Sequence, residues 1–214
     1  VILTKLLSYT FLGRASGIIS NNVDLIIVSR FLGPETVAVL SLTRKPIDLS
    51  REMINQPVVA FMPAISHISG SAETEKRREV LSRLIKILIW ILFLIIGGMI
   101  AFNENFVKLW VGSQLFAGST INLLLCFGAF IAVLTQSAGY FSLSLGNIKR
   151  NSLAILTQSL LYIPMVILGT KYFGLFGVVI APIISMLAIT AWYFPLSVSK
   201  IVKFSNRDLK KITK

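Results

Sequence analysis

The feature that most constrains this chain is an uninterrupted apolar run, ILIWILFLIIGGMIAF, at residues 87–102. It lies within a predicted helix of about 20 residues (84–102), a length that matches a hydrocarbon core about 30 Å thick. In the whole chain 55% of the residues are apolar and only 14% are charged, with a mean hydropathy of +0.79. A soluble domain is nearer a quarter charged, so the composition indicates an all-α protein that crosses the membrane several times.

The apolar runs, and the Gly and Pro residues between them, predict six transmembrane helices. Their approximate ranges are 6–28, 37–64, 84–102, 121–143, 153–168 and 175–198. Residues 1–199 would form one six-helix lobe, and residues 200–214 a basic cytoplasmic tail. This tail either lies as a short amphipathic helix on an anionic leaflet or extends freely into solvent. The chain begins at Val1 and not at a methionine, so we expect it to be part of a longer protein.

Basic residues are distributed unevenly between the two ends of the predicted helices. If Lys5 is cytoplasmic, that side holds fourteen Lys and Arg residues, and the opposite side holds only Arg30, Lys108 and Lys171. The positive-inside rule then places both ends of the chain in the cytoplasm. The net charge of +12 comes largely from these clusters of basic residues between the apolar runs. Nucleic-acid binding is not expected, because it needs a basic surface on a polar fold.

The sequence contains no recognisable enzyme motif. It has no Walker loop, no Gly-rich dinucleotide turn, no His-Glu metal pair and no Ser with a plausible His partner. Cys126 is the single cysteine and His67 the single histidine, which excludes an internal disulfide and argues against a His/Cys metal site. We therefore expect neither an enzyme, nor a cofactor, nor a metal ion.

Seven charged residues interrupt the first two predicted helices. Five of them, Arg44, Lys45, Asp48, Arg51 and Glu52, fall in the stretch SLTRKPIDLSREMINQ (41–56). On a helical wheel these five fall with Asn55 and Gln56 within about 140°, and Leu42, Ile47, Leu49, Met53 and Ile54 take the other side. A charge at mid-membrane costs at least ~2.5 kcal/mol, so this stripe is expected to face a bundle interior or a watery cavity.

The first predicted helix has a polar face of its own. Arg14, Asn21 and Asp24 lie within about 80° of one another on a helical wheel. This face and the stripe of the second helix would together form a cavity wall. A carrier of a polar molecule needs such a cavity at the bilayer midplane, where two helix bundles meet.

Two interpretations of these charges stay open. In one they pair with each other: Asp48 lies one turn from both Arg44 and Glu52, Arg51 neighbours both carboxylates, and Asp24 pairs with Arg14. In the other they bind a ligand. Four cations face three carboxylates, so one cation is left for an anion, and a guanidinium suits a phosphate because it binds two oxygens at once.

Several short motifs resemble those of a known transporter family. They are Phe31-Leu32-Gly33 with Val37-Ala38-Val39-Leu40, the helix end at 57–64, Leu109-Trp110-Val111-Gly112, Leu145-Gly146-Asn147-Ile148-Lys149, and Gly174-Leu175-Phe176-Gly177-Val178-Val179-Ile180-Ala181. In order and spacing they resemble the polysaccharide exporter and O-antigen flippase family, which belongs with the multidrug and toxin extrusion transporters. Members typically have two six-helix lobes, and this chain resembles the second lobe.

The resemblance implies a flippase of the bacterial plasma membrane. It would move a polyprenyl-pyrophosphate-linked oligosaccharide to the outer leaflet for surface polysaccharide synthesis, by alternating access through a basic central cavity. The implied partners are this lipid-linked oligosaccharide, membrane lipids, an N-terminal six-helix lobe, a polysaccharide polymerase and glycosyltransferases. The implied substrate-binding residues are Arg14, Arg44, Lys45 and Arg51; the ion- or proton-coupling residues are Asp24, Asp48 and Glu52; and the polar cavity-lining residues are Asn21 and Asn55.

Two other functions are compatible with the sequence. A multidrug cation antiporter of the same fold would need carboxylates without competing cations, and the surplus of basic residues speaks against it. A non-transporting scaffold in a polysaccharide assembly complex would have mutually satisfied charges. Removal of a single charge would then reduce the amount of protein and leave the activity of the remainder unchanged.

Overall fold

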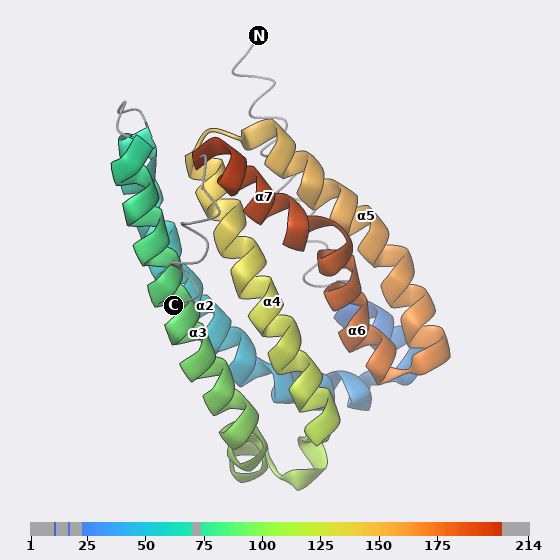
Figure 1. Ribbon diagram of the computed structural model, residues 1–214. Helices are drawn as coiled ribbons and strands as arrows, with labels where there is room; N and C mark the ends of the chain where they lie inside the picture. The colour runs from blue at the N-terminus through green and yellow to red at the C-terminus, as the bar shows by residue number, and fades with distance from the viewer. Residues whose placement is uncertain (1–10, 12–16, 18–22, 70–73, 203–214) are drawn as a thin grey trace.

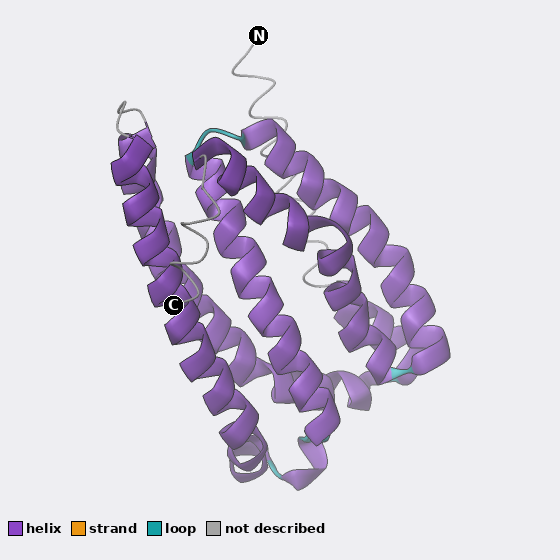
Figure 2. Ribbon diagram, viewed as in Figure 1, coloured by secondary structure: helices purple, strands orange, loops and turns teal. Residues whose placement is uncertain are grey.

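The computed structural model describes residues 11, 17, 23–69 and 74–202. Within these ranges the chain is helical apart from short connections, and no strand occurs there (Figure 2). The all-α expectation is confirmed for this part of the chain.

The helices follow one another with very short connections. Helical residues 23–32 are followed by α2 (Pro34–Ser69), α3 (Thr74–Val111), the short 3₁₀ helix η1 (Ser113–Leu115), α4 (Ser119–Ser144) and α5 (Ile148–Phe173). Then α6 (Leu175–Ser185), the π-helical η2 (Met186–Thr190) and α7 (Ala191–Val202) continue without a gap. Figure 1 shows a bundle with the α4–α5 turn and the end of α7 at one end, and η1 and the α5–α6 turn at the other.

In the part of the chain that the structure describes, four helical segments are long and apolar enough to cross a membrane. They are Arg78–Val111, Ser119–Ser144, Ile148–Phe173 and Leu175–Lys200, and they indicate a membrane protein. The helix α2 is also long, with 36 residues, but charged and amide residues interrupt its apolar sequence and it is not among the four. Most of the first predicted span, 6–28, lies outside the described residues.

The helix α3 is longer than the sequence predicted. The expected span was 84–102, but the helix runs from Thr74 to Val111. No Gly or Pro stands between Gly98 and Gly112, and the helix ends at Gly112, whose φ of 101° favours glycine. At 1.5 Å per residue its 38 residues span about 57 Å, so α3 extends beyond the hydrocarbon core.

Exposed aromatic residues gather at the end of the bundle that holds η1 and the α5–α6 turn. Phe106 and Trp110 lie in the last turns of α3, and Tyr172 and Phe173 end α5. Such residues favour the level of the lipid headgroups, so this end of the bundle fits a membrane interface.

Two hydrophobic cores hold the helices together, and α4 contributes to both. The first core includes Ile47, Leu92 and Val133 and joins α2, α3 and α4 with the end of α7. The second core includes Val28, Leu40 and Val166 and joins residues 23–32 to the start of α2, α4, α5 and α6. The space between these two cores is where the polar residues of α2 lie.

Prolines shape α2 and the α6–α7 segment. Pro46, Pro57 and Pro63 lie inside α2, each removing one backbone donor, and α2 bends along its length but stays continuous (Figure 1). Pro182 and Pro195 flank η2, whose wider helical turn separates α6 from α7. Such π-helical turns occur frequently at functional sites.

A close backbone contact joins α5 to α6 across the Gly174 turn. A Cβ added to Gly177 would lie 2.0 Å from the carbonyl oxygen of Gly169, which leaves no room for any side chain. The glycine pair therefore sets how closely the two helices approach, as small residues do in membrane bundles.

We expect Gly177→Ala to destabilise the protein by about 1–3 kcal/mol, because the two backbones must move apart. Thermal unfolding of the purified protein in detergent measures the loss. The matched control is Gly97→Ala on α3, where an added Cβ meets nothing within 4 Å. Equal melting temperatures for the two variants would contradict the close contact.

Candidate functional site

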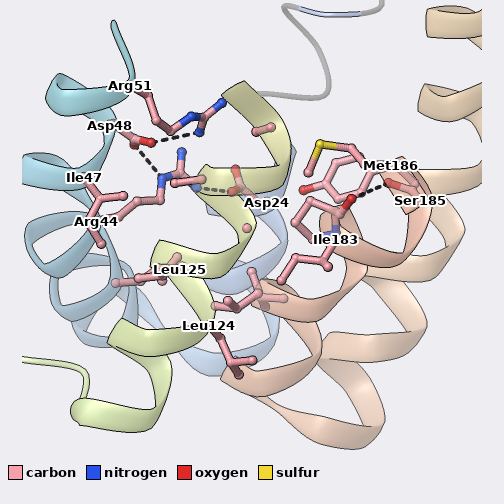
Figure 3. Close-up of a pocket in the computed structure, with 18 of the residues that line it drawn as sticks. Asp24, Arg44, Ile47, Asp48, Arg51, Leu124, Leu125, Ile183, Ser185 and Met186 are labelled. Carbon is pink, nitrogen blue, oxygen red and sulfur yellow. Dashed lines mark hydrogen bonds and ion pairs between the residues drawn. The ribbon is translucent and has the colours of Figure 1, made fainter. Parts of the chain in front are cut away.

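A cavity of about 150 Å³ lies between the two cores. Its walls come from residues 23–32, α2, α4, α5, α6 and the start of η2. The polar residues that line it are Asp24, Arg44, Asp48, Arg51, Gln136, Gln158, Tyr162 and Ser185. Apolar residues such as Leu124, Leu125 and Ile183 complete the lining (Figure 3).

The helix α2 brings its polar residues to the cavity by regular spacing. Arg44, Asp48, Arg51 and Asn55 recur every three or four residues and therefore share one face of the helix. A buried apolar ridge runs beside this face and contains Leu40, Ile47, Ile54 and Val58. Both isoleucines were expected on the opposite side of the helix, but α2 packs against both α3 and α4, so its buried arc is wider than a single stripe.

Four charged side chains form a continuous chain of ion pairs, here called the charge network (Asp24, Arg44, Asp48 and Arg51). Arg44 donates to Asp24 through Nη1 and to Asp48 Oδ2 through Nε, the latter over 2.8 Å. Arg51 Nη1 donates to Asp48 Oδ1 over 3.1 Å (Figure 3). The pairs that Asp48 forms with Arg44 and Arg51 were predicted from their spacing.

The partner of Asp24 differs from the prediction. The sequence suggested Arg14, which lies outside the described residues, but the structure pairs Asp24 with Arg44 on α2. The Asp24 side chain is only 9% exposed, so this ion pair lies well inside the bundle. It ties residues 23–32 to α2.

The two arginines of the charge network differ in the number of their carboxylate partners. Arg44 is held on two sides by carboxylates, one on its own helix and one on another. Arg51 has one carboxylate partner, and its buried Nε has no hydrogen-bond partner among the residues that the structure describes. The Nε donor of Arg51 is therefore available to a ligand, whereas the Nε of Arg44 is already bonded to Asp48.

The remaining predicted site residues lie in different places. Lys45 and Glu52 are exposed on the outward side of α2 and do not line the cavity. Asn55 is buried, and its Nδ2 donates to Gln136 Oε1 on α4 over 2.9 Å. Asn21, like Arg14, lies outside the described residues.

A buried polar cluster beside the charge network fixes the orientation of α2. Asn103 Nδ2 on α3 donates to Asn122 Oδ1 on α4 over 2.7 Å and to the carbonyl of Thr43 over 3.0 Å. The Thr43 hydroxyl accepts the backbone N–H of Ala117 over 2.9 Å. Because Thr43 precedes Arg44, these bonds set the rotation of α2 that turns Arg44 toward the cavity.

Sequence reasoning missed the residues on the far side of the cavity. Gln136, Gln158 and Tyr162 were not among the predicted site residues. The last two are four residues apart, and this spacing in an apolar helix is a usable signal of a shared face. In the described part of the chain, no three His, Cys, Asp or Glu residues lie close enough to hold a metal ion.

Comparison with protein families identifies the chain. A family model described as "polysaccharide biosynthesis protein" matches residues 3–118, more than half of the 214 residues. The chain belongs to this family. Comparisons with curated proteins and with solved structures found no match.

The matched region of this polysaccharide biosynthesis protein includes α2, α3 and all four residues of the charge network. The resemblance to a family of polysaccharide exporters is thereby confirmed. The protein is a membrane protein with a role in polysaccharide biosynthesis.

Proposed function

We propose that the protein is a flippase that moves a polyprenyl-pyrophosphate-linked oligosaccharide across the bacterial plasma membrane. The observation that carries this proposal is a cavity among membrane helices in which Arg51 retains an unpaired guanidinium donor. A diphosphate cannot cross hydrocarbon unaided, and a guanidinium is well suited to bind its oxygens. The protein's membership of a polysaccharide biosynthesis family supports this class of substrate.

Binding would change the partners of Arg51 while the rest of the charge network stays in place. An unpaired buried donor costs about 1–3 kcal/mol, and a phosphate oxygen at Arg51 Nε removes that cost. Asp48 keeps its bond to Arg44 when a phosphate engages Arg51, so no carboxylate is left without a partner. Asp24 and Asp48 are the carboxylates at which a coupling ion or proton would act.

The size of the cavity indicates which part of the substrate it holds. At about 150 Å³ the cavity is smaller than the roughly 300–1,000 Å³ of pockets that enclose a drug-sized ligand. It has room for a diphosphate group and not for an oligosaccharide. In this proposal the glycan lies outside the described cavity, toward a second six-helix lobe that completes the pathway, and six transmembrane helices of this chain form one lobe.

The described basic residues support an orientation with both ends in the cytoplasm. The following basic residues lie near the bundle end that holds the α4–α5 turn: Arg78, Arg83, Lys86, Lys149, Arg150 and Lys200. Near the other end are Arg30, Lys108 and Lys171. The positive-inside rule assigns the first end to the cytoplasm.

One observation favours the second candidate function, a non-transporting scaffold. The three ion pairs of the charge network satisfy much of its hydrogen-bonding capacity, as a purely structural role requires. The cavity also holds as many arginines as aspartates, which does not favour the third candidate, an organic-cation site. Only the flippase proposal gives a use to the unpaired donor of Arg51.

Depletion of the protein in its host tests the proposed function. We expect the lipid-linked oligosaccharide to accumulate in the cytoplasmic leaflet and surface polysaccharide to fall, because synthesis continues while translocation stops. The measurement is the fraction of the lipid-linked glycan that an impermeant enzyme modifies before and after the plasma membrane is permeabilised. If depletion instead lowers the total amount of lipid-linked oligosaccharide, the protein acts in its synthesis and the flippase proposal is wrong.

A further inference from the structure

We propose that Gln136 and Gln158, here called the amide wall, are further substrate-binding residues that donate hydrogen bonds to the diphosphate in the cavity that Arg51 lines. This inference rests on the proposed function. It adds two residues of α4 and α5 to a site that otherwise comes from α2 and residues 23–32.

Gln136 is held beside Arg51 by a contact with α2. It lines the cavity from α4, and its Oε1 accepts the Asn55 Nδ2 hydrogen over 2.9 Å. Asn55 lies one helical turn after Arg51 on the same face of α2. The side-chain amide of Gln136 therefore lies at the Arg51 end of the cavity with its oxygen already occupied.

Gln158 is held in the same manner on the opposite wall. It lines the cavity from α5, and its Oε1 accepts a hydrogen bond of 2.6 Å from the Thr190 hydroxyl. Thr190 is buried at the end of η2, the π-helical turn between α6 and α7. The π-helical turn thus supplies the donor that fixes the orientation of this amide.

Each amide oxygen already accepts one hydrogen bond, from Asn55 or Thr190, and the NH₂ groups remain as donors for a ligand in the cavity. The NH₂ groups of both side chains have no hydrogen-bond partner among the residues that the structure describes. Together with Arg51 they give the cavity donors beside the paired carboxylates of Asp24 and Asp48, and a phosphate or diphosphate can accept from all of these donors. Asn55 and Thr190 are positioning residues, because they act through the glutamines.

A purely structural role for the amide wall makes a different prediction. Glutamines often join membrane helices by hydrogen bonds, and the bonds to Asn55 and Thr190 link α2 with α4 and α5 with η2. In that case substitution would lower thermal stability without a selective loss of anion binding. Affinity and stability must therefore be measured on the same variants.

The test uses the full-length protein in lipid nanodiscs, titrated with inorganic pyrophosphate in a calorimeter. We expect Gln136→Glu and Gln158→Glu to weaken pyrophosphate binding about tenfold or more, because each replaces a donor by a carboxylate. The matched control is Gln114→Glu, the same change at an exposed position of η1 outside the cavity, which should leave the affinity within about twofold of the wild type.

Two further variants keep the inference testable if an acidic variant fails to fold. Gln158→Met removes the donor without adding charge and should weaken pyrophosphate binding several-fold. The melting temperature should change little, because the Thr190 hydroxyl can still donate to the carbonyl oxygen of Met186, 3.4 Å away. Thr190→Val should have a smaller effect in the same direction, because it releases the Gln158 amide without removing it. A lower melting temperature with unchanged affinity in both variants would overturn the inference.

The outcomes separate this inference from the proposed function. If wild-type protein does not bind pyrophosphate, or Arg51→Ala binds it equally well, the proposed function itself fails. If Arg51→Ala loses binding but the glutamine variants keep it, only the amide wall is overturned.

Nanodiscs that contain a polyprenyl diphosphate show whether the bound diphosphate is carried by a lipid. The lipid should compete with pyrophosphate for the site, and an absence of competition would overturn a lipid-borne ligand.

Discussion

Arg51→Ala should reduce polysaccharide export by about tenfold or more while the protein inserts and folds normally. A hydrogen bond to a charged group contributes about 1.5–3 kcal/mol, and the variant removes every bond between Arg51 and the proposed diphosphate. The fold should persist because Asp48 keeps its 2.8 Å bond to Arg44. Surface polysaccharide and the amount of protein in the membrane are measured in the same cells.

The choice of variants separates charge from geometry. Arg51→Lys keeps one positive charge but loses the planar fork, so its export should be intermediate. Lys171→Ala removes a positive charge at the end of α5, outside the cavity, and should export like the wild type. Arg14→Ala, combined with Arg51→Ala, should abolish export, and wild-type export by this double variant would exclude the basic cavity as the substrate site.

Arg44→Ala should reduce stability as well as export. Arg44 is the shared partner of Asp24 and Asp48, and its removal leaves the largely buried Asp24 without its partner. Removal of one member of a buried ion pair destabilises a protein by about 3 kcal/mol or more. A lower melting temperature in detergent, and less protein in the membrane, are therefore expected for Arg44→Ala but not for Arg51→Ala.

A combined neutralisation tests the cause of that instability. In Asp24→Asn with Arg44→Gln neither buried carboxylate nor buried guanidinium remains at the contact between residues 23–32 and α2. This double variant should recover most of the melting temperature that Arg44→Ala loses, since uncharged partners still form hydrogen bonds. If the double variant is as unstable as Arg44→Ala, the unpaired Asp24 is not the cause.

The approximate positions of α2 to α7 were predictable because their signals are local, whereas most of the first predicted helix lies outside the described residues. Long apolar runs marked α3, α4, α5 and the α6–α7 segment, and four turns coincide with glycines of positive φ, at Gly33, Gly112, Gly146 and Gly174. The ion pair between Arg44 and Asp48 was also predictable, because residues four apart meet on one face of a helix.

The contacts between helices could not be predicted in the same way. Asp24 and Arg44 are 20 residues apart, and Gln158 and Thr190 are 32 apart, so their pairing depends on how whole helices pack. Ile47 and Ile54 were placed on the other side of α2 from the charges, but at 100° per residue each lies only about 60° from an arginine of the charge network, and both are buried. The π-helical turn at η2 has no clear local signal beyond its flanking prolines.

The most direct test of the central claim is translocation by the purified full-length protein in proteoliposomes. The substrate is a polyprenyl-diphosphate-linked glycan that an external enzyme can modify only in the outer leaflet. The account predicts that wild-type protein makes the inner-leaflet glycan accessible, and that Arg51→Ala, equally well incorporated, does not. Equal accessibility with wild type, Arg51→Ala and protein-free liposomes would contradict it.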